Sequence, residues 1–213
     1  MSQGKTYKFY GSEFRLVTGY GSTIAITGAT NADPCVITAV AHGIATHGVV
    51  KVASVVGMLE LNDRLFAAER ITDDTLRLVG VDSTNYGAYV SGGTIQVGTS
   101  TAHCEQTTYS FDSGATPVTE DETNCGVITN TGSPKLGTLG LGFKAAENAF
   151  QDGIEASRRA ASEVAFIVQV KGMTKVRYDI GYVTQTGESG SSGGTWDGTA
   201  SVQLTQNRIK VTA

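Results

Sequence analysis

The chain has 213 residues, of which 27 are glycine, 3 are proline and 40% are hydrophobic. This composition is typical of a globular, turn-rich chain rather than a disordered one, and the length allows one large domain or two small ones. The formal net charge of −4 argues against a surface that grips nucleic acid, because such surfaces carry clustered basic side chains.

The N-terminal region contains two short runs with β character. Lys5–Tyr10 and Glu13–Val17 are rich in aromatic and apolar residues. Gly11 interrupts the chain after the first run, and Gly19-Tyr20-Gly21 follows the second as a break. We therefore expect two short strands, each followed by a glycine turn.

Residues 28–98 contain a series of short apolar runs separated by turn signals. Their spacing of about 8 to 12 residues is typical of a small barrel or sandwich. The block has four Lys or Arg against seven Asp or Glu, so it carries no basic stripe. The expected strands are Val36–Thr38, Val49–Val55, Arg64–Glu69, Thr75–Val79 and Thr94–Val97.

The longest polar stretch, Thr116–Ser133, predicts a loop. It contains the acidic run Glu120-Asp121-Glu122. A glycine-rich segment, Leu136–Phe143, follows and reads as a strand in which glycines allow close backbone approach. It does not end as a phosphate-binding loop ends, with Lys and Ser or Thr.

Residues 144–161 predict a helix, because apolar side chains recur there at helical spacing. Arg158 and Arg159 fall in its last turns, where cationic side chains interact favourably with the helix dipole. The apolar stripe is thin and Gly153 weakens the helix. An isolated helix of this kind is marginal in water, so we expect it to dock on a sheet or on a neighbouring subunit.

The C-terminal part predicts antiparallel strands. Apolar residues alternate over 164–170 and again over 176–182, with a turn signal at Gly172, which indicates a hairpin. A Gly/Ser-rich loop at 187–194 leads to a last strand, Thr199–Val211. Because the apolar positions of that strand change parity near Gln206-Asn207, we expect a bulge or tight turn there.

No combination of residues in the sequence indicates catalysis or metal binding. The odd number of cysteines fits reduced thiols, and the histidines, which lack metal-ligand spacing, are expected in turns or on the surface. No nucleophile elbow and no compelling carboxylate pair is present. We therefore predict a protein that is not an enzyme and uses no metal or cofactor. The residues concerned are Cys35, Cys104, Cys125, His42, His47 and His103.

Residues 28–98 also carry four motifs in a fixed order. They are Ala41-His42-Gly43, Gly57-Met58-Leu59-Glu60-Leu61-Asn62-Asp63-Arg64-Leu65-Phe66, Asp73-Asp74-Thr75-Leu76-Arg77-Leu78 and Tyr89-Val90-Ser91-Gly92-Gly93-Thr94. In content and order they resemble the small all-β first-catalytic-cysteine half-domain fold of ubiquitin-activating enzymes, which is also widespread in bacteriophage tail proteins. The resemblance implies an inserted all-β barrel module and no reaction.

Three runs outside this block carry a second resemblance. They are Lys135–Phe143 before the expected helix, Phe166–Val170 after it, and Thr199–Thr205 near the end. With the order of the elements, they resemble the major tail tube proteins of long-tailed, siphovirus-like bacteriophages. The resemblance implies a mainly β fold: a discontinuous tail-tube-type β-sandwich or barrel, residues 1–27 and 99–213, with one flanking helix and with the module at 28–98 inserted.

The tail tube resemblance also implies a function. Hexameric rings of the chain would stack into the tube that conducts DNA from head to host, without specific DNA binding. The implied partners are other copies of the chain and the tape-measure, tail terminator and tail-tip proteins. Glu120, Asp121 and Glu122 would lie in an inter-ring loop or near the lumen, or form a merely solvated loop. The module would decorate the outside, where it stabilises neighbouring subunits or contacts glycans.

The expected location is the virion tail, after assembly in the host cytoplasm. The chain has neither an apolar run long enough to span a membrane nor the apolar core of a secretion signal near Met1, so we expect no membrane insertion. The alternative function is a tail-tip, baseplate or fibre adhesin that binds the host surface. The two functions differ in assembly, because the tube requires stacked hexameric rings and an adhesin is more often trimeric.

Overall fold

The computed structural model describes residues 6–114, 118–123, 126–131 and 135–212. These residues form a mainly β structure, as predicted, with an α-helix, α1 (Ala149–Ala160), and a short 3₁₀ helix, η1 (Leu59–Leu61). The strands are β1 (Glu13–Ala25), β2 (Gly28–Ala29), β3 (Val36–Thr38), β4 (His47–Val56), β5 (Arg64–Arg70), β6 (Thr75–Leu78), β7 (Ser91–His103), β8 (Gln106–Asp112), β9 (Val118–Thr123), β10 (Gly126–Thr131), β11 (Thr138–Lys144), β12 (Glu163–Gln169), β13 (Lys175–Ser189), β14 (Asp197–Leu204) and β15 (Ile209–Thr212).

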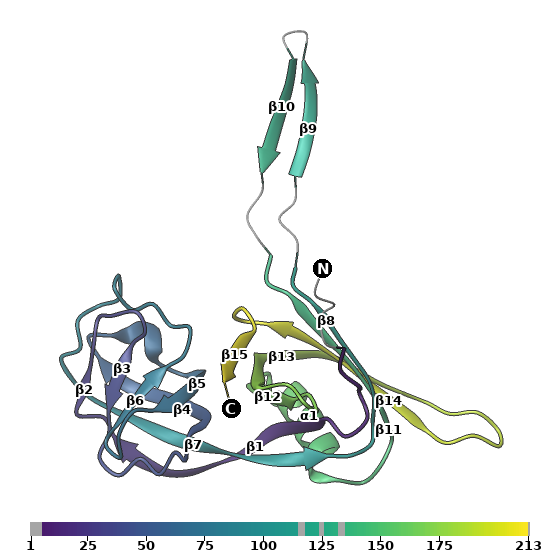
Figure 1. Ribbon diagram of the computed structural model, residues 1–213, viewed down its shortest axis with the longest axis horizontal. Coiled ribbons are helices and arrows are strands. Elements are labelled where there is room, and N and C mark those ends of the chain that lie inside the picture. The colour runs from purple at the N-terminus through teal and green to yellow at the C-terminus, as the bar shows by residue number, and fades with distance from the viewer. Residues whose placement is uncertain (1–5, 115–117, 124–125, 132–134, 213) are drawn as a thin grey trace.

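Thirteen of these strands form one antiparallel sheet. Its order is β2-β3-β6-β5-β4-β7-β1-β12-β13-β14-β11-β8, and β15 pairs with β13 beside this path. The sheet is not closed on itself, so β2 and β8 are its outer strands (Figure 1). β9 and β10 form a separate two-stranded sheet.

The long strands β1 and β7 connect the block at 28–98 to the rest of the molecule. They pair from Phe14↔His103 to Ala25↔Thr94. The predicted break at Gly19-Tyr20-Gly21 is wrong, because β1 continues through it with shifts of register between Val17 and Gly19 and between Tyr20 and Thr23. Such irregularities bend a strand without ending it, and glycine tolerates them. Because β7 runs from Ser91 to His103, the domain boundary expected between residues 98 and 99 lies inside this strand.

The N-terminal prediction is corrected at a second point. Residues 6–10 of the predicted Lys5–Tyr10 strand form no strand, and Lys5 lies outside the described residues. The segment is held locally instead: the Ser12 amide donates a hydrogen bond to the Phe9 carbonyl, and the Phe9 and Phe14 rings lie 5.2 Å apart. A β-like composition without a partner strand is not sufficient for a strand.

The strands predicted within 28–98 are confirmed, with small differences at their ends. β3 has the predicted bounds, whereas β4 and β5 are slightly longer and β6 ends at Leu78. The predicted Thr94–Val97 is only the middle of β7. These strands surround an apolar core of their own, with Ile37, Phe66 and Ile95 among its buried members.

The helix is shorter than predicted. Lys144 still belongs to β11, and the helix begins only after Asn148. The side-chain oxygen of Asn148 accepts a hydrogen bond from the Gln151 amide at this end of the helix. The helix ends at Ala161, which has a left-handed conformation (φ 47°). Phe150 and Ile154 are the buried residues of α1 and face the sheet, which confirms the expected docking surface on a sheet.

The C-terminal hairpin and the predicted irregularity are confirmed. β12 and β13 pair from Glu163↔Tyr182 to Gln169↔Val176. β14 and β15 run along β13 one after the other, separated by residues 205–208, so the predicted single strand is interrupted there. The interruption places apolar residues of both strands in the core, namely Val202, Leu204, Ile209 and Val211.

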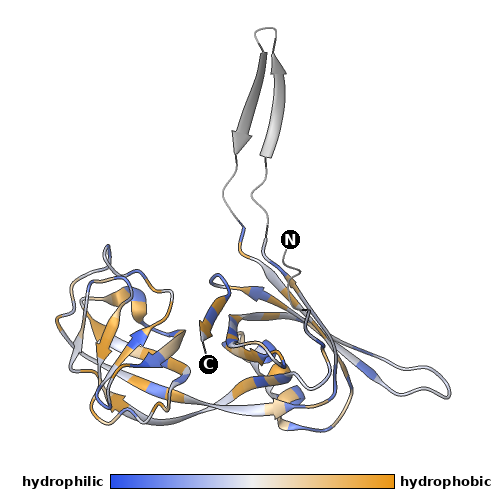
Figure 2. Cartoon of the chain, viewed as in Figure 1, coloured by the Kyte–Doolittle hydropathy of each residue, from blue (hydrophilic) through white to orange (hydrophobic). Residues whose placement is uncertain are grey.

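The described residues form three apolar cores. The first lies within the block at 28–98 and the second lies between α1 and the sheet. The third lies between the block and the rest of the chain, where Val49 and Leu65 of the block pack with residues of β1, β12, β13 and β15. Figure 2 shows apolar residues gathered in the block and around β12 and α1, whereas the projecting end of β13 and β14 is paler or hydrophilic. The block is thus packed against its host.

Candidate assembly surface

The predicted loop Thr116–Ser133 contains a β-hairpin. β9 and β10 pair antiparallel, with Asp121 opposite Ile128. The prediction of a loop is therefore wrong for residues 118–123 and 126–131, while Thr116 and Ser133 lie outside the described residues. The β-branched run Val127-Ile128-Thr129 is the sequence feature that indicates a strand here. The polar composition of β9 favoured the prediction of a loop instead. The sequence of this stretch shows no alternation of apolar and polar residues that would have predicted two strands.

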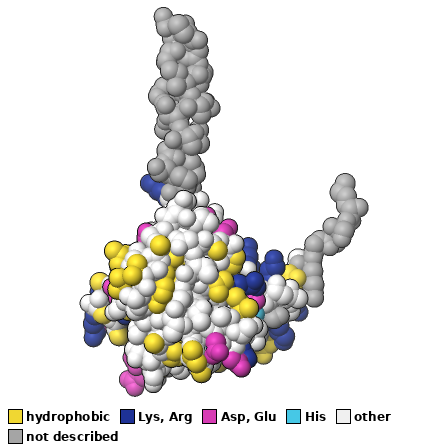
Figure 3. Space-filling model, turned by 90° about the vertical axis from the view of Figure 1, so that its left-hand side faces the viewer, with side chains coloured by type: hydrophobic (Ala, Val, Ile, Leu, Met, Phe, Trp, Pro, Cys, Tyr) yellow, Lys and Arg dark blue, Asp and Glu magenta, His cyan; other side chains and the backbone are white. Residues whose placement is uncertain are grey.

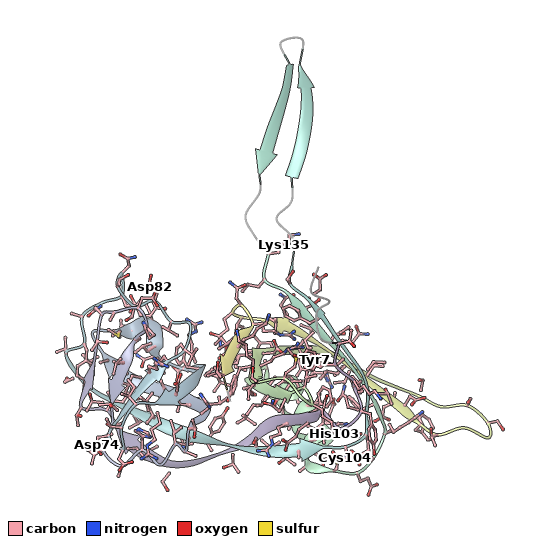
Figure 4. All side chains as sticks on the ribbon, in the orientation of Figure 1. Tyr7, Asp74, Asp82, His103, Cys104 and Lys135 are labelled. Carbon is pink, nitrogen blue, oxygen red and sulfur yellow. The ribbon has the colours of Figure 1, made fainter. Side chains whose placement is uncertain are left out.

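The acidic run lies in this hairpin. Glu120, Asp121 and Glu122 belong to β9, opposite residues 127–129 of β10. Figure 1 shows the hairpin projecting beyond β8 and β11, and Figure 4 shows Lys135 at its base. The structure thus places three acidic residues on a two-stranded hairpin rather than in the predicted loop. Their role in assembly stays a prediction.

Strand β8 is an open edge of the main sheet. It pairs with β11 from Asp112↔Thr138 to Gln106↔Phe143. No described strand pairs with its other side. An open edge presents unpaired backbone N–H and C=O groups, which are a template for another strand. β8 is also the strand that precedes the β9–β10 hairpin in the chain, and Figure 1 shows both on the same side of the molecule.

A buried polar cluster holds β8 against the interior of the sheet. Asp179 of β13 is fully buried and accepts hydrogen bonds from Arg208 Nε at 2.7 Å and Nη2 at 2.8 Å. The Tyr109 hydroxyl of β8 donates to the same carboxylate, and the Arg208 guanidinium lies 3.4 Å from the centroid of the Phe111 ring. Burial and the negative charge of Asp179 raise the pKa of Tyr109 well above its usual range. Tyr109 is therefore a neutral donor at physiological pH.

The end of the β13–β14 hairpin is a second projection. Pairing of β13 with β14 continues past Ala200, a member of the second apolar core, to Ser189↔Asp197. Trp196, just before β14, is 62% exposed. Its ring packs closely on Gly190, where a Cβ would lie 2.9 Å from a ring atom. A large exposed aromatic side chain on a projecting hairpin is a common feature of surfaces that bind other proteins.

The cysteines and histidines form no chemical site in the described part of the chain. Cys35 is buried, and burial raises the pKa of its thiol. His42 and His103 are buried as well, which corrects the expectation of surface histidines. Cys104 is exposed beside His103 at the end of β7 (Figure 4), and Cys125 is not among the described residues. No group of three potential metal-ligating side chains occurs among the described residues.

His103 has a structural setting. Its ring stacks on Phe150 of α1 at 4.1 Å between centroids and meets Phe143 edge-on. Its Nδ1 lies 2.9 Å from Glu105 Oε2, and burial lowers the pKa of His103 although Glu105 opposes the shift. His103 therefore packs as a neutral aromatic residue beneath the helix.

Comparisons with known proteins do not identify a family. No protein-family model matches the chain, and no curated protein is significantly similar to it in sequence. In the described part of the chain, no helix is both long enough and apolar enough to cross a membrane. The geometry of the molecule therefore carries the functional argument.

Proposed function

We propose that the chain is the structural subunit of a bacteriophage tail tube, in which hexameric rings stack to form the conduit for DNA. The observation that carries the proposal is the β9–β10 hairpin, which pairs with no other described strand. A two-stranded hairpin is marginally stable by itself in water. A neighbouring ring would supply the surface that stabilises it.

The open sheet supports the same proposal. The strands of residues 1–27 and 99–213 would form the tail-tube-type sandwich, with α1 against one side. In a closed ring, the β8 edge would meet a neighbouring copy, and closure removes edges that otherwise pair indiscriminately. Rings joined head to tail by a heterologous contact then extend into a filament.

The inserted block would lie on the outside of such a tube, and the third apolar core would hold it in a fixed orientation. The net charge of −4 suits a tube through which DNA passes, because like charges limit binding to the wall. The tape-measure, tail terminator and tail-tip proteins would complete the assembly. None of this requires a catalytic group, a metal or a cofactor.

The first experiment is negative-stain electron microscopy of the full chain over a concentration series. Hexameric rings and tubes are the expected result. Monomers or trimers at every concentration would overturn the proposal, and trimers would favour the host-surface adhesin instead.

A second experiment tests the acidic run. The variant Glu120→Gln/Asp121→Asn/Glu122→Gln should retain rings but form fewer tubes. Its matched control, Asp33→Asn/Glu147→Gln/Asp152→Asn, removes the same formal charge from exposed side chains on other segments and should form tubes like the parent chain. Equal tube lengths for the two variants would show that the acidic run has no role in stacking.

A further inference from the structure

A cleft separates the inserted block from α1. It has a volume of about 340 Å³. Lys51, Asp63 and Leu65 line it from the block, and the side of α1 lines it opposite them. This volume lies within the range of about 300 to 1,000 Å³ that is typical of sites for small molecules. The cleft is separate from the β8 edge and from the β9–β10 hairpin.

Two tyrosines lie in the wall of this cleft. Tyr20 of β1 and Tyr182 of β13 are 37% and 42% exposed. Tyr182 is the cross-strand partner of Glu163, and the charge of Glu163 also acts on Tyr20, so both tyrosines lie close to this carboxylate. Burial first, and the charge of Glu163 second, raise the pKa of Tyr20 to about 12. Tyr20 is thus a neutral phenol, and both tyrosines line the cleft.

Glu163 is held in place by other groups. Its Oε2 accepts a hydrogen bond from the Leu65 amide at 2.9 Å, and its Oε1 accepts one from the Thr205 hydroxyl at 2.6 Å. These bonds connect the block, β12 and the segment before β15. Because both oxygens are already engaged, Glu163 sets the shape of the cleft more than it binds a ligand.

Two other charged groups are free to bind a ligand. Lys51 Nζ lies 5.9 Å from the centroid of the Tyr20 ring and forms no ion pair with a described residue. The carboxylate of Asp63 accepts no hydrogen bond from the described part of the chain. With the carboxylate of Glu163, the charged side chains that line the cleft sum to −1 (one Lys against one Asp and one Glu), so the cleft disfavours an anionic ligand. The side chains of Ser157 and Ser162 add neutral hydroxyl groups.

We propose that this cleft binds one unit of a neutral saccharide. A sugar ring presents C–H groups that pack on an aromatic face, and its hydroxyls both donate and accept hydrogen bonds. Tyr20 and Tyr182 supply the aromatic faces, Lys51 the donor and Asp63 the acceptor. The site does not depend on tube assembly, so this proposal and the proposed function can be tested independently of each other.

The test is ligand-observed saturation-transfer NMR on the full chain, which also works for large assemblies. The probes are galactose, N-acetylglucosamine and rhamnose, with sialic acid as the charged comparison. At least one neutral sugar should bind, and Tyr182→Ala should weaken its binding at least about tenfold, as expected for loss of about 1.4 kcal/mol of contact free energy. Tyr10→Ala removes a tyrosine that is 85% exposed elsewhere and should leave binding unchanged.

A second variant protects the test against misfolding. Asp63→Asn keeps the shape of an exposed side chain with no described partner, and it should also weaken sugar binding while the thermal unfolding midpoint stays that of the parent chain. Three results would overturn the proposal: no neutral sugar binds, sialic acid binds more tightly than every neutral sugar, or both cleft variants bind as the parent chain does. Tubes that form normally with any of these results would leave the proposed function intact.

Discussion

Arg208 and Asp179 form a two-point ion pair in the interior of the molecule. The donor and acceptor atoms are 2.7 and 2.8 Å apart, Asp179 is fully buried, and the Arg208 side chain is only 9% exposed. Tyr109 completes the cluster from β8. The three side chains thus join the edge strand β8 and the interior strand β13 to the segment that separates β14 from β15.

Asp179→Ala is expected to destabilise the fold by about 3 to 5 kcal/mol, because removing one partner leaves a buried charge without compensation. The free energy of unfolding from urea denaturation measures the loss. Asp197→Ala is the matched control, since Asp197 pairs with Lys144 at a half-exposed position, where ion pairs contribute about 0 to 1 kcal/mol. Similar losses of unfolding free energy for the two variants would show that the buried ion pair contributes no more to stability than the exposed one.

Replacing His103 should change how stability depends on pH. Burial lowers the pKa of His103 in the folded state, so the unfolded chain binds more protons once the pH falls through its own value of about 6.5. The free energy of unfolding therefore declines as the pH falls below that value, until the folded state is protonated as well. His103→Phe keeps an aromatic ring against Phe150 and should flatten this decline.

The measurement for His103 is urea denaturation over a pH series from about 5 to 8, the range in which histidine titrates. His47→Gln, at the start of β4, is the control and should keep the slope of the parent chain. A slope that His103→Phe leaves unchanged would assign the pH dependence to other groups.

The sequence predicted those strands whose apolar residues face a core. Val164 and Phe166, two residues apart, face the core between α1 and the sheet, and β12 lies where this alternation predicts a strand. The β9–β10 hairpin was missed because its sequence shows no such alternation of apolar residues. The prediction of a strand before Gly11 failed because composition alone does not supply a pairing partner.

The cluster of Tyr109, Asp179 and Arg208 and the cleft at Tyr20 were not predictable from the sequence. Tyr109 and Arg208 are 99 residues apart in the chain, and only the pairing of β8 with β11 and of β11 with β14 brings them together. Asp179 stands in a strand of alternating apolar residues, where a charged side chain ordinarily faces solvent. Local patterns do not encode which faces of distant strands meet.

Gly153→Ala is expected to destabilise the chain although alanine favours helices. The gain in helix propensity is about 1 kcal/mol, whereas a Cβ at this position would lie 3.0 Å from side-chain carbons of Leu16 and Thr18, and such overpacking costs about 1 to 3 kcal/mol. The net loss should be about 1 kcal/mol in urea denaturation. Ser157→Ala, one turn later on α1, gains propensity without this contact and should be neutral or slightly stabilising. A Gly153→Ala variant more stable than the parent would mean that β1 yields to the new methyl group.

Removing the inserted block should unfold its host rather than expose a simpler tube protein. The chain enters the block and returns to the host strands at neighbouring points, because the Ile26 amide donates a hydrogen bond to the Gly93 carbonyl at 2.9 Å. A two-residue Asn-Gly turn in place of residues 27–92 therefore closes the gap without strain. The deletion nevertheless uncovers the third apolar core, including Tyr178, Ile180 and Ile209. Each large apolar side chain returned to water costs roughly 1.5 to 3 kcal/mol, against a total stability of about 5 to 15 kcal/mol. Circular dichroism and size-exclusion chromatography should therefore show an unfolded or aggregated chain. A folded, soluble deletion variant would instead show that the host folds without the block and that the third apolar core is not required for its stability.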